Sequence, residues 1–339
     1  MVTQKELKAF YETDLKPKLL FFEEQRLLLM SKRTVLWIIY GILLILSTLL
    51  IIFLNSEYNY FQTIYRKFDL NFFDLLSHHN DSINNFLFFL GIMLYMITFY
   101  MAIAYSYTKM KSDYRNSFKT TVVGSLVEFI NENLSYTPKD DSMVKELLFK
   151  QEFNNSNLFM TQYDRWSGED YVGGILGGIS LNFSEIHVVR NAYDFKYDLF
   201  KGLFFVFNVN WNFEGFTTVI VYEDHWDFFL KKFSLAKKES KFKVYSDNPT
   251  IAKYVFSTAF MERLLALHYQ LKVPIELSFV NSKLYMAISI EEDLFEPPIS
   301  STVLDFQLIQ TIFEYMNLGQ EIVGELIVLM KQPNQIDLK

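Results

Sequence analysis

Two pairs of side chains have the types and the spacing needed to move protons. Glu169 and Asp170 are adjacent acids, and Glu185 and His187 lie two residues apart in a segment rich in Val, Ile and Phe. Because side chains alternate across a strand, Glu185 and His187 share one face if that segment is extended. A carboxylate beside an imidazole can act in general acid–base catalysis. The same residues also make ordinary structural hydrogen bonds, and that is the role we expect.

A short glycine-rich stretch is the candidate for binding a phosphate or a cofactor. It contains Gly173, Gly174, Gly177 and Gly178, in the sequence GGILGG. A phosphate loop needs such glycines because backbone N–H groups must wrap around the anion. However, no Lys-Ser or Lys-Thr pair follows, and the next segment has the composition of a strand. The pattern therefore predicts a strand corner or hairpin where two backbones pass closely, and no cofactor.

A second group of carboxylates, Glu291-Glu292-Asp293 with Glu296, is followed by two prolines. Paired acids could bind a divalent cation, but a solvated turn needs no further assumption, and we predict no metal site. The 339 residues include no cysteine, which excludes a thiol nucleophile, a disulfide scaffold and Cys-ligated zinc or iron–sulfur sites. The net charge of −7 argues against general nucleic-acid binding, so no nucleic-acid partner is expected.

The chain has two long uncharged apolar runs. Residues 34–54 and 86–107 contain no Asp, Glu, Lys, Arg or His. At about 1.5 Å per residue, a helix of either length spans about 30 Å, the thickness of a bilayer hydrocarbon core. The runs therefore predict two transmembrane helices that contact the lipid bilayer. They carry none of the ionisable residues that mark a proton or ion pathway.

Basic residues predict the orientation of these spans. Nine lie within 20 residues outside the two runs, whereas the segment between the runs has only Arg66 and Lys67. The nine are Lys16, Lys18, Arg26, Lys32, Arg33, Lys109, Lys111, Arg115 and Lys119. By the positive-inside rule, both termini are expected in the cytoplasm of a bacterial cell, with the protein in its inner membrane.

We therefore divide the chain into five parts. They are an N-terminal cytoplasmic helical segment (1–33), a first span (34–54), an extracytoplasmic loop (55–85), a second span (86–108) and a cytoplasmic domain (109–339). Aromatic and apolar residues recur at near-helical spacing in the loop, which fits a short helix on the outer membrane surface or a small covering structure. In the N-terminal segment, Pro17 is expected to interrupt the helix.

The cytoplasmic part reads as an α+β domain with a largely antiparallel sheet and flanking helices. Helices are expected over 117–134, 141–149, 246–267 and 302–330. Strands are expected over 180–189, 202–209, 217–223, 241–245, 275–280 and 283–290, the last two joined by a turn at Asn281-Ser282. Strands in a run, then a helix and a hairpin, are typical of α+β proteins. From Ser112 onward there are 21 Lys and Arg against 30 Asp and Glu, so this domain carries a net charge of −9.

An ordered set of motifs in this domain resembles the bacterial family catalogued as domain of unknown function 3137. The motifs are Gly168-Glu169-Asp170, Phe183-Ser184-Glu185, Phe200-Lys201-Gly202-Leu203-Phe204, Val244-Tyr245-Ser246-Asp247, Phe260-Met261-Glu262-Arg263-Leu264 and Asp293-Leu294-Phe295-Glu296-Pro297. The likeness runs from about Leu158 to Pro297. It implies two preceding membrane spans but no activity. Phe183 and Phe204 are expected in the core, and Glu185 and Lys201 as an exposed cross-strand pair or part of a binding surface.

These observations favour a membrane-anchored binding, scaffold or regulatory protein, with a protein partner or self-association expected. One alternative is an enzyme at the membrane surface, with the glycine-rich stretch and Glu169, Asp170, Glu185 and His187 around one cleft. It requires those side chains to converge. A second alternative is a homo-oligomeric channel, in which small residues such as Gly91 let helices approach closely.

Overall fold

The computed structural model describes residues 2–67, 72–138, 143–159, 162–192, 195–209, 215–221, 235–239, 242–247 and 258–330. The chain forms two compact units. One comprises Met1–Leu19, Asn116–Pro297 and Val303–Lys339, and the other comprises Leu20–Arg115 and Pro298–Thr302.

The second unit is built on two long helices. These are α2 (Lys16–Lys67) and α3 (Phe72–Phe118), and each contains one of the apolar runs. Both helices are long and apolar enough to cross a membrane. They continue well past the runs into the segment that we expected to form a loop with a surface helix. That segment is therefore helical on both sides of residues 68–71, which lie outside the described part of the chain.

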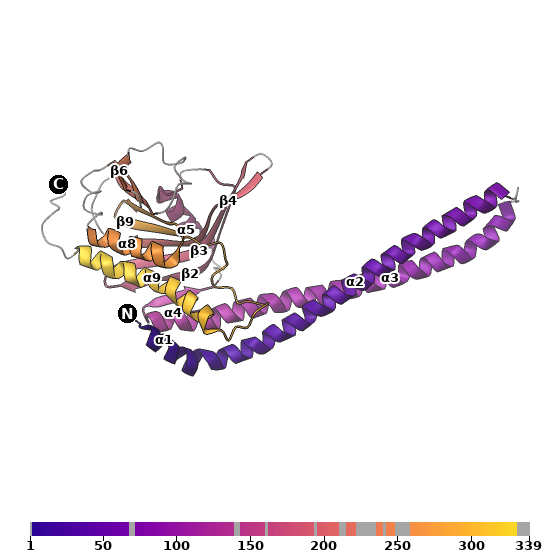
Figure 1. Cartoon of the computed structure of the whole chain (residues 1–339), viewed down its shortest axis with the longest axis horizontal. Helices are drawn as coiled ribbons and strands as arrows, with labels where there is room; N and C mark the ends of the chain where they lie inside the picture. Colours follow the sequence, from indigo (N-terminus) through magenta and orange to yellow (C-terminus); the bar gives the residue numbers. More distant parts are fainter. Residues whose placement is uncertain are drawn as a thin grey trace. The chain divides into compact units, whose positions relative to one another are not determined.

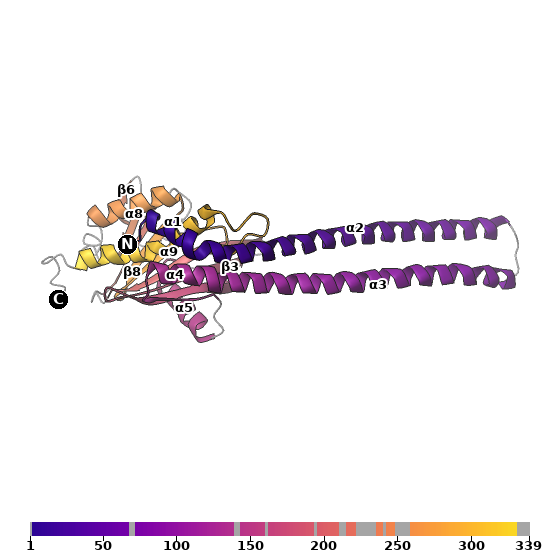
Figure 2. The ribbon, with the colours of Figure 1, turned by 90° about the horizontal axis from the view of Figure 1, so that it is seen from below.

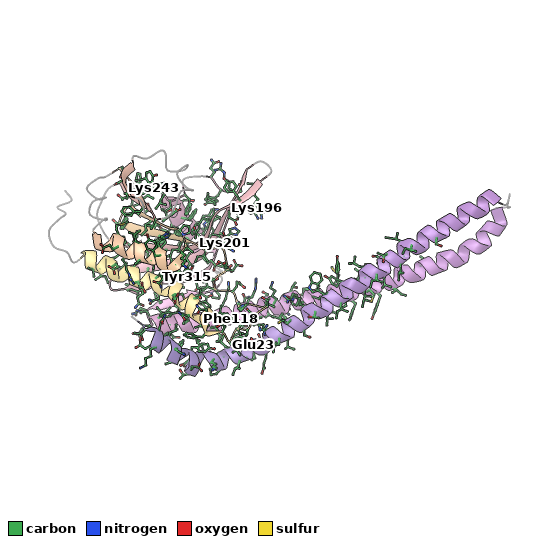
Figure 3. The ribbon with its side chains drawn as sticks, viewed as in Figure 1. Glu23, Phe118, Lys196, Lys201, Lys243 and Tyr315 are labelled. Atoms are coloured by element: carbon green, nitrogen blue, oxygen red, sulfur yellow. The ribbon has the colours of Figure 1, made fainter. Side chains whose placement is uncertain are left out.

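Many of the described side chains in the apolar runs are exposed. Figure 3 shows them projecting along α2 and α3. Large exposed examples are Trp37, Ile38, Ile45, Ile51 and Ile52 on α2, and Leu94, Tyr95, Met101 and Tyr105 on α3. One contact fixes the register of the two helices: the Lys32 ammonium donates to Ser106 Oγ at 3.0 Å. Since Lys32 lies just before the first run and Ser106 near the end of the second, the two runs begin and end at the same level.

The N-terminal residues form the helix that the sequence predicts. Helix α1 (Gln4–Phe10) starts with a capping box in which Thr3 and Glu6 bond reciprocally. It passes through a π-helical turn, η1 (Tyr11–Leu15), directly into α2. The helix does not break at Pro17, which lies in the first turn of α2. The irregularity is the π-helical turn just before it, where a proline removes an N–H donor and crowds the carbonyl one turn earlier.

The first unit contains a nine-stranded sheet in which every neighbouring pair is antiparallel. Its strands are β1 (Leu134–Thr137), β2 (Arg165–Leu176), β3 (Ile179–Ala192), β4 (Phe195–Asn208), β5 (Phe216–Val221), β6 (Leu235–Glu239), β7 (Phe242–Ser246), β8 (Ile275–Val280) and β9 (Lys283–Ser289). Their order across the sheet is β1-β2-β3-β4-β9-β8-β5-β7-β6.

Helices cover both faces of this sheet, as Figures 1 and 2 show together. Helix α5 (Met143–Asn155) lies on one face, and α8 (Thr258–Leu271) and α9 (Phe306–Met330) lie on the other. Strand β4 accordingly buries both of its sides. Phe204 packs with Phe149 and Phe153 of α5, whereas the neighbouring Phe205 faces Gly319 of α9. This two-sided burial explains why β4 has an unbroken run of Phe and Val.

The α+β class is confirmed, and so are the core positions of Phe183 and Phe204, which are both fully buried. The hairpin at Asn281-Ser282 is also confirmed: both residues have positive φ, as a two-residue turn between right-twisted strands requires. Strands β1, β2 and β6 were not predicted. The first part of the helix expected over 246–267 falls on residues 248–257, which lie outside the described residues.

Candidate functional site

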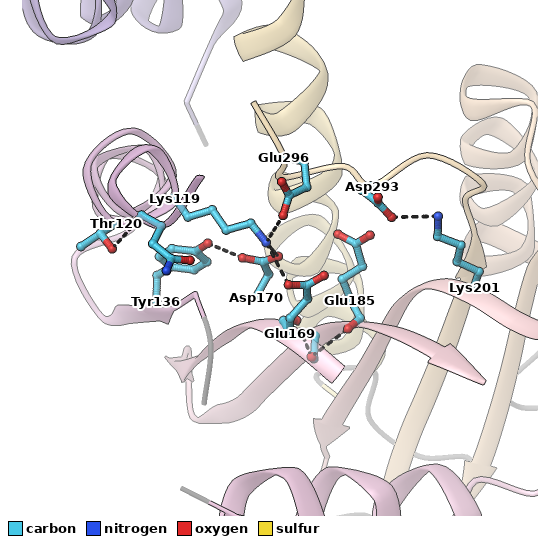
Figure 4. A network of polar contacts seen from close by, with 11 residues as sticks. Lys119, Thr120, Tyr136, Glu169, Asp170, Glu185, Lys201, Asp293 and Glu296 are labelled. Carbon is cyan, nitrogen blue, oxygen red and sulfur yellow. Dashed lines mark hydrogen bonds and ion pairs between the residues drawn. The ribbon is translucent and has the colours of Figure 1, made fainter. Parts of the chain in front are cut away.

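A buried lysine is the centre of the polar network in Figure 4. Lys119 is the first residue of η2 (Lys119–Val123), a π-helical turn between α3 and α4 (Gly124–Ile130). The buried side chains of η2 and α4 recur at helical spacing: Lys119, Val122, Val123, Leu126, Val127 and Ile130. Lys119 therefore occupies the apolar face of an amphipathic helix, where an ammonium group needs anionic partners.

Three carboxylates surround the Lys119 ammonium. The Nζ atom lies 2.7 Å from Asp170 Oδ2, 2.9 Å from Glu296 Oε1 and 3.0 Å from Glu169 Oε2. Two of these acids come from β2, and Glu296 comes from the segment that follows β9. The lysine thus joins three parts of the chain that are distant in sequence.

A β-bulge turns Asp170 toward the lysine. Glu169 pairs with Glu185 and Val172 with Phe183, so β2 has one extra residue at this point. Asp170 lies at this bulge and has a φ of +58°, a left-handed conformation that Asp tolerates better than most residues do. Its N–H donates to Pro138 O at 2.9 Å, and its Oδ1 accepts a hydrogen bond from the Tyr136 hydroxyl. Asp170 is 0% exposed.

Glu185 on β3 lies beside this network but outside its ion pairs. It is opposite Glu169 on β2 and Leu203 on β4, and it is buried. The expectation that Glu185 is exposed and pairs with Lys201 is therefore wrong. Lys201 pairs across β3–β4 with His187, and its ammonium binds Asp293 Oδ1 at 2.8 Å and Glu291 O at 2.5 Å.

Burial controls how these groups titrate. It raises the pKa of Asp170 to about 7, against the opposing effects of Lys119 and Tyr136. It also raises the pKa of Glu185 to about 8, and repulsion from Asp170, Glu169 and Asp293 adds to this shift. For Lys119, burial disfavours the charge, but the carboxylates outweigh it and the pKa is raised. Lys119 is thus charged at neutral pH, whereas burial favours the protonated form of Glu185.

These shifts predict that stability falls as pH rises. Glu185 and Asp170 have folded-state pKa values above those of an unfolded chain, so between about pH 4 and pH 8 the folded state binds more protons. Their contribution to stability is complete below the unfolded pKa and is lost as pH passes the folded pKa. We expect the thermal unfolding midpoint of the full chain in detergent to decrease between about pH 5 and pH 9, and to decrease less in Glu185→Gln. An equal decrease in both proteins would contradict this assignment.

The structure brings together three of the four predicted acid–base residues. Glu169, Asp170 and Glu185 belong to the network, whereas His187 forms a separate pair with Asp198, with Nε2 2.7 Å from Oδ1. The glycines have a different role. Gly177 and Gly178, with φ +56° and +86°, form the β2–β3 turn, and Gly174 lies against the backbone of Asn133. The turn is seven residues from Asp170, about 23 Å along an extended strand.

Sequence reasoning missed the residues that organise this site. Lys119 was counted with the basic residues that flank the membrane spans, and Asp293 and Glu296 were expected in a solvated turn. Both acids instead bind lysines. The signal was present for Lys119, because it precedes Val122 and Val123 by one helical turn and so lies on their face. Tyr136 offered no such signal, since β1 itself was not predicted.

The fold defines an α+β domain with a nine-stranded antiparallel sheet, in a chain with two helices long and apolar enough to span a membrane. Residues 198–327, which extend from β4 into α9, match the family model described as "Protein of unknown function (DUF3137)". The resemblance that the motifs suggested is thereby confirmed. The matched region does not include the Gly168-Glu169-Asp170 and Phe183-Ser184-Glu185 motifs.

No curated protein matches the sequence. Among solved structures, the chain is similar to the mycobacterial trehalose monomycolate transport factor A, TtfA. The two share 9% identity, with 58% of this chain and 93% of that chain covered and a TM-score of 0.30. A similarity of this size carries no argument about function.

Proposed function

We propose that this protein is a membrane-anchored binding protein, a scaffold or regulator of a bacterial inner-membrane assembly, with its α+β domain in the cytoplasm. The observation that carries the proposal is the exposure of large apolar side chains along both α2 and α3. Contiguous apolar surface of this extent is unfavourable in water and favourable in lipid.

The register of α2 and α3 supports the membrane anchor. Because Lys32 bonds to Ser106, the two apolar runs cover the same length of the helix pair and would cross the same slab of lipid. Lys32 and Arg33 then lie at the same end as Lys109 and Lys111. This concentration of positive charge favours a cytoplasmic location for that end and for the domain that follows α3.

The polar network favours binding over catalysis. Lys119 neutralises Asp170 and contacts Glu169 and Glu296, which gives these acids a structural role. His187, which the enzymatic alternative places with the acids, bonds to Asp198 instead. The domain is also strongly acidic, so a partner with a basic surface would be attracted to it and anionic lipid would be repelled.

Site-directed labelling tests the anchor and its orientation. Because the sequence has no native cysteine, each introduced cysteine is the only thiol of the protein that can react. We would introduce Ser77→Cys between the apolar runs and Glu132→Cys in the exposed turn between α4 and β1, then treat intact cells with a membrane-impermeant maleimide. We expect Ser77→Cys to react in intact cells and Glu132→Cys to react only after permeabilisation. Both variants should stay in the membrane fraction after alkaline carbonate washing. Reaction of Glu132→Cys in intact cells would show that the topology is the reverse of the one proposed. Release of the protein by carbonate would contradict the proposed membrane anchor.

The binding role is tested by the size of the assembly. After extraction in a mild detergent, we expect the protein to migrate in a complex larger than its monomer, and cross-linking before extraction should preserve that complex. A protein that is monomeric under both conditions would contradict a scaffold role, and also the oligomeric channel considered above.

A further inference from the structure

We propose that Glu185, Glu169 and Asp293 form a binding site for one organic cation, a guanidinium or primary ammonium group. Glu185 lies at the bottom of this site. The proposal deepens the binding function inferred above and rests on it. The source of the cation is either a basic side chain of a protein partner or a free amine, since both have the same chemistry.

The residue at the bottom of the site is a buried glutamate whose carboxyl group lacks a hydrogen-bond partner among the described residues. Glu185 is 6% exposed, and its side chain makes no hydrogen bond or ion pair with any residue in the described part of the chain. Buried carboxylates in native proteins are normally paired, because an unpaired polar group loses its hydration without compensation. Figure 4 shows the Glu185 carboxyl directed toward the region between Glu169 and Asp293.

Two partly exposed acids form the rim. The side chains of Glu169 and Asp293 are 47% and 52% exposed, so a ligand can reach the site from solvent. Each binds its lysine through one oxygen, Oε2 of Glu169 and Oδ1 of Asp293. Glu169 Oε1 and Asp293 Oδ2 make no hydrogen bond to a described residue, and they remain available as acceptors for a cation.

Charge balance points to a cationic ligand. Five carboxyl groups (Glu169, Asp170, Glu185, Asp293 and Glu296) lie in or beside this network. The ion pairs of the described residues bring two lysines to it, Lys119 and Lys201, and both are already engaged. One added positive charge would compensate Glu185 and offset the repulsion among its neighbours. Within the described residues, no group of three His, Asp or Glu side chains has the arrangement of a metal site. An ammonium or guanidinium group fits this arrangement better, because it tolerates longer and less regular contacts than a metal ion does.

The chain provides a matched control for Glu185. Glu276 on β8 is also 6% exposed, and burial raises its pKa to about 8, as for Glu185. Its neighbours across β5 and β9 are Ile220 and Ala287, so it lacks acidic side chains at those positions. Glu276→Gln therefore removes a similar buried carboxyl without touching the proposed site.

The experiment is calorimetric titration of the full chain in detergent with two probes, agmatine and the blocked peptide acetyl-Gly-Arg-Gly-amide. The peptide acetyl-Gly-Gln-Gly-amide is the neutral control. We expect saturable binding of at least one basic probe, weakened about tenfold or more in Glu185→Gln and in Asp293→Asn and unchanged in Glu276→Gln. Because Glu185 must ionise to bind a cation, affinity should rise about fiftyfold between about pH 6 and pH 8, in proportion to the ionised fraction of this carboxyl group.

The outcomes separate the site from its ligand and from the proposed function. Tighter binding of the peptide indicates a basic side chain of a partner, and tighter binding of agmatine indicates a free amine. No saturable binding of either basic probe, or equal weakening by Glu185→Gln and Glu276→Gln, would overturn the site. Because the maleimide experiment does not depend on these acids, it can confirm the anchor when the titration fails, and it can fail when the titration succeeds.

Discussion

Replacement of Lys119 by methionine is expected to destabilise the α+β domain by about 3–5 kcal/mol, because it removes the ammonium group that compensates the buried Asp170 carboxyl group. Methionine preserves most of the volume of the lysine stem, so loss of packing contributes little. The Asp170 carboxyl group then keeps the hydrogen bond that the Tyr136 hydroxyl donates to Oδ1, and it still lies next to Glu169. The measurement is the thermal unfolding midpoint of the full chain in detergent, followed by near-ultraviolet circular dichroism.

Two further variants make this result specific. Lys16→Met removes a lysine from an exposed pair with Glu12, where water screens the charges, and we expect no change in the midpoint. Adding Asp170→Asn to Lys119→Met removes the stranded carboxylate, and we expect the double variant to recover most of the lost stability. If Lys119→Met behaves like Lys16→Met, the network does not hold the three chain segments together.

The sequence was sufficient to predict the elements that depend on apolar patterning. The two membrane-length helices follow from long uncharged runs, and β3, β4, β5, β8 and β9 follow from concentrated Val, Ile and Phe. In each case, the residues that form the element also supply the apolar surface that it buries. The periodicity therefore survives in the sequence whatever the tertiary arrangement is.

The candidate site was only partly predictable, because its geometry depends on non-local pairing. Strand β2 contains Gly168, Gly173 and Gly174 and forms a strand because β3 and β1 pair with its two edges. The bulge that turns Asp170 inward is a mismatch between β2 and β3, so neither strand contains it alone. Glu296 lies 177 positions after Lys119, and no local pattern links the two.

The glycine of the Phe200-Lys201-Gly202-Leu203-Phe204 motif has a physical role that a substitution should expose. Gly202 lies in β4 with φ +145°, and a Cβ atom there would lie 2.1 Å from Ile288 O and 2.7 Å from Ile290 N. Both contacts are with the backbone around the end of β9, which pairs with β4 at this position. We expect Gly202→Ala to destabilise the domain by about 3 kcal/mol or more, since strain in φ and overpacking act together.

Gly178→Ala separates these two causes. Gly178 also has positive φ, +86°, but no atom lies within 4 Å of the position that its Cβ would take. The alanine there meets only the unfavourable backbone conformation, and we expect a loss of about 1–2 kcal/mol. A larger decrease in the unfolding midpoint for Gly202→Ala than for Gly178→Ala would show that the close approach of β4 and β9 requires glycine. Equal decreases would mean that φ strain alone accounts for both, and that the two strands can separate enough to admit a methyl group.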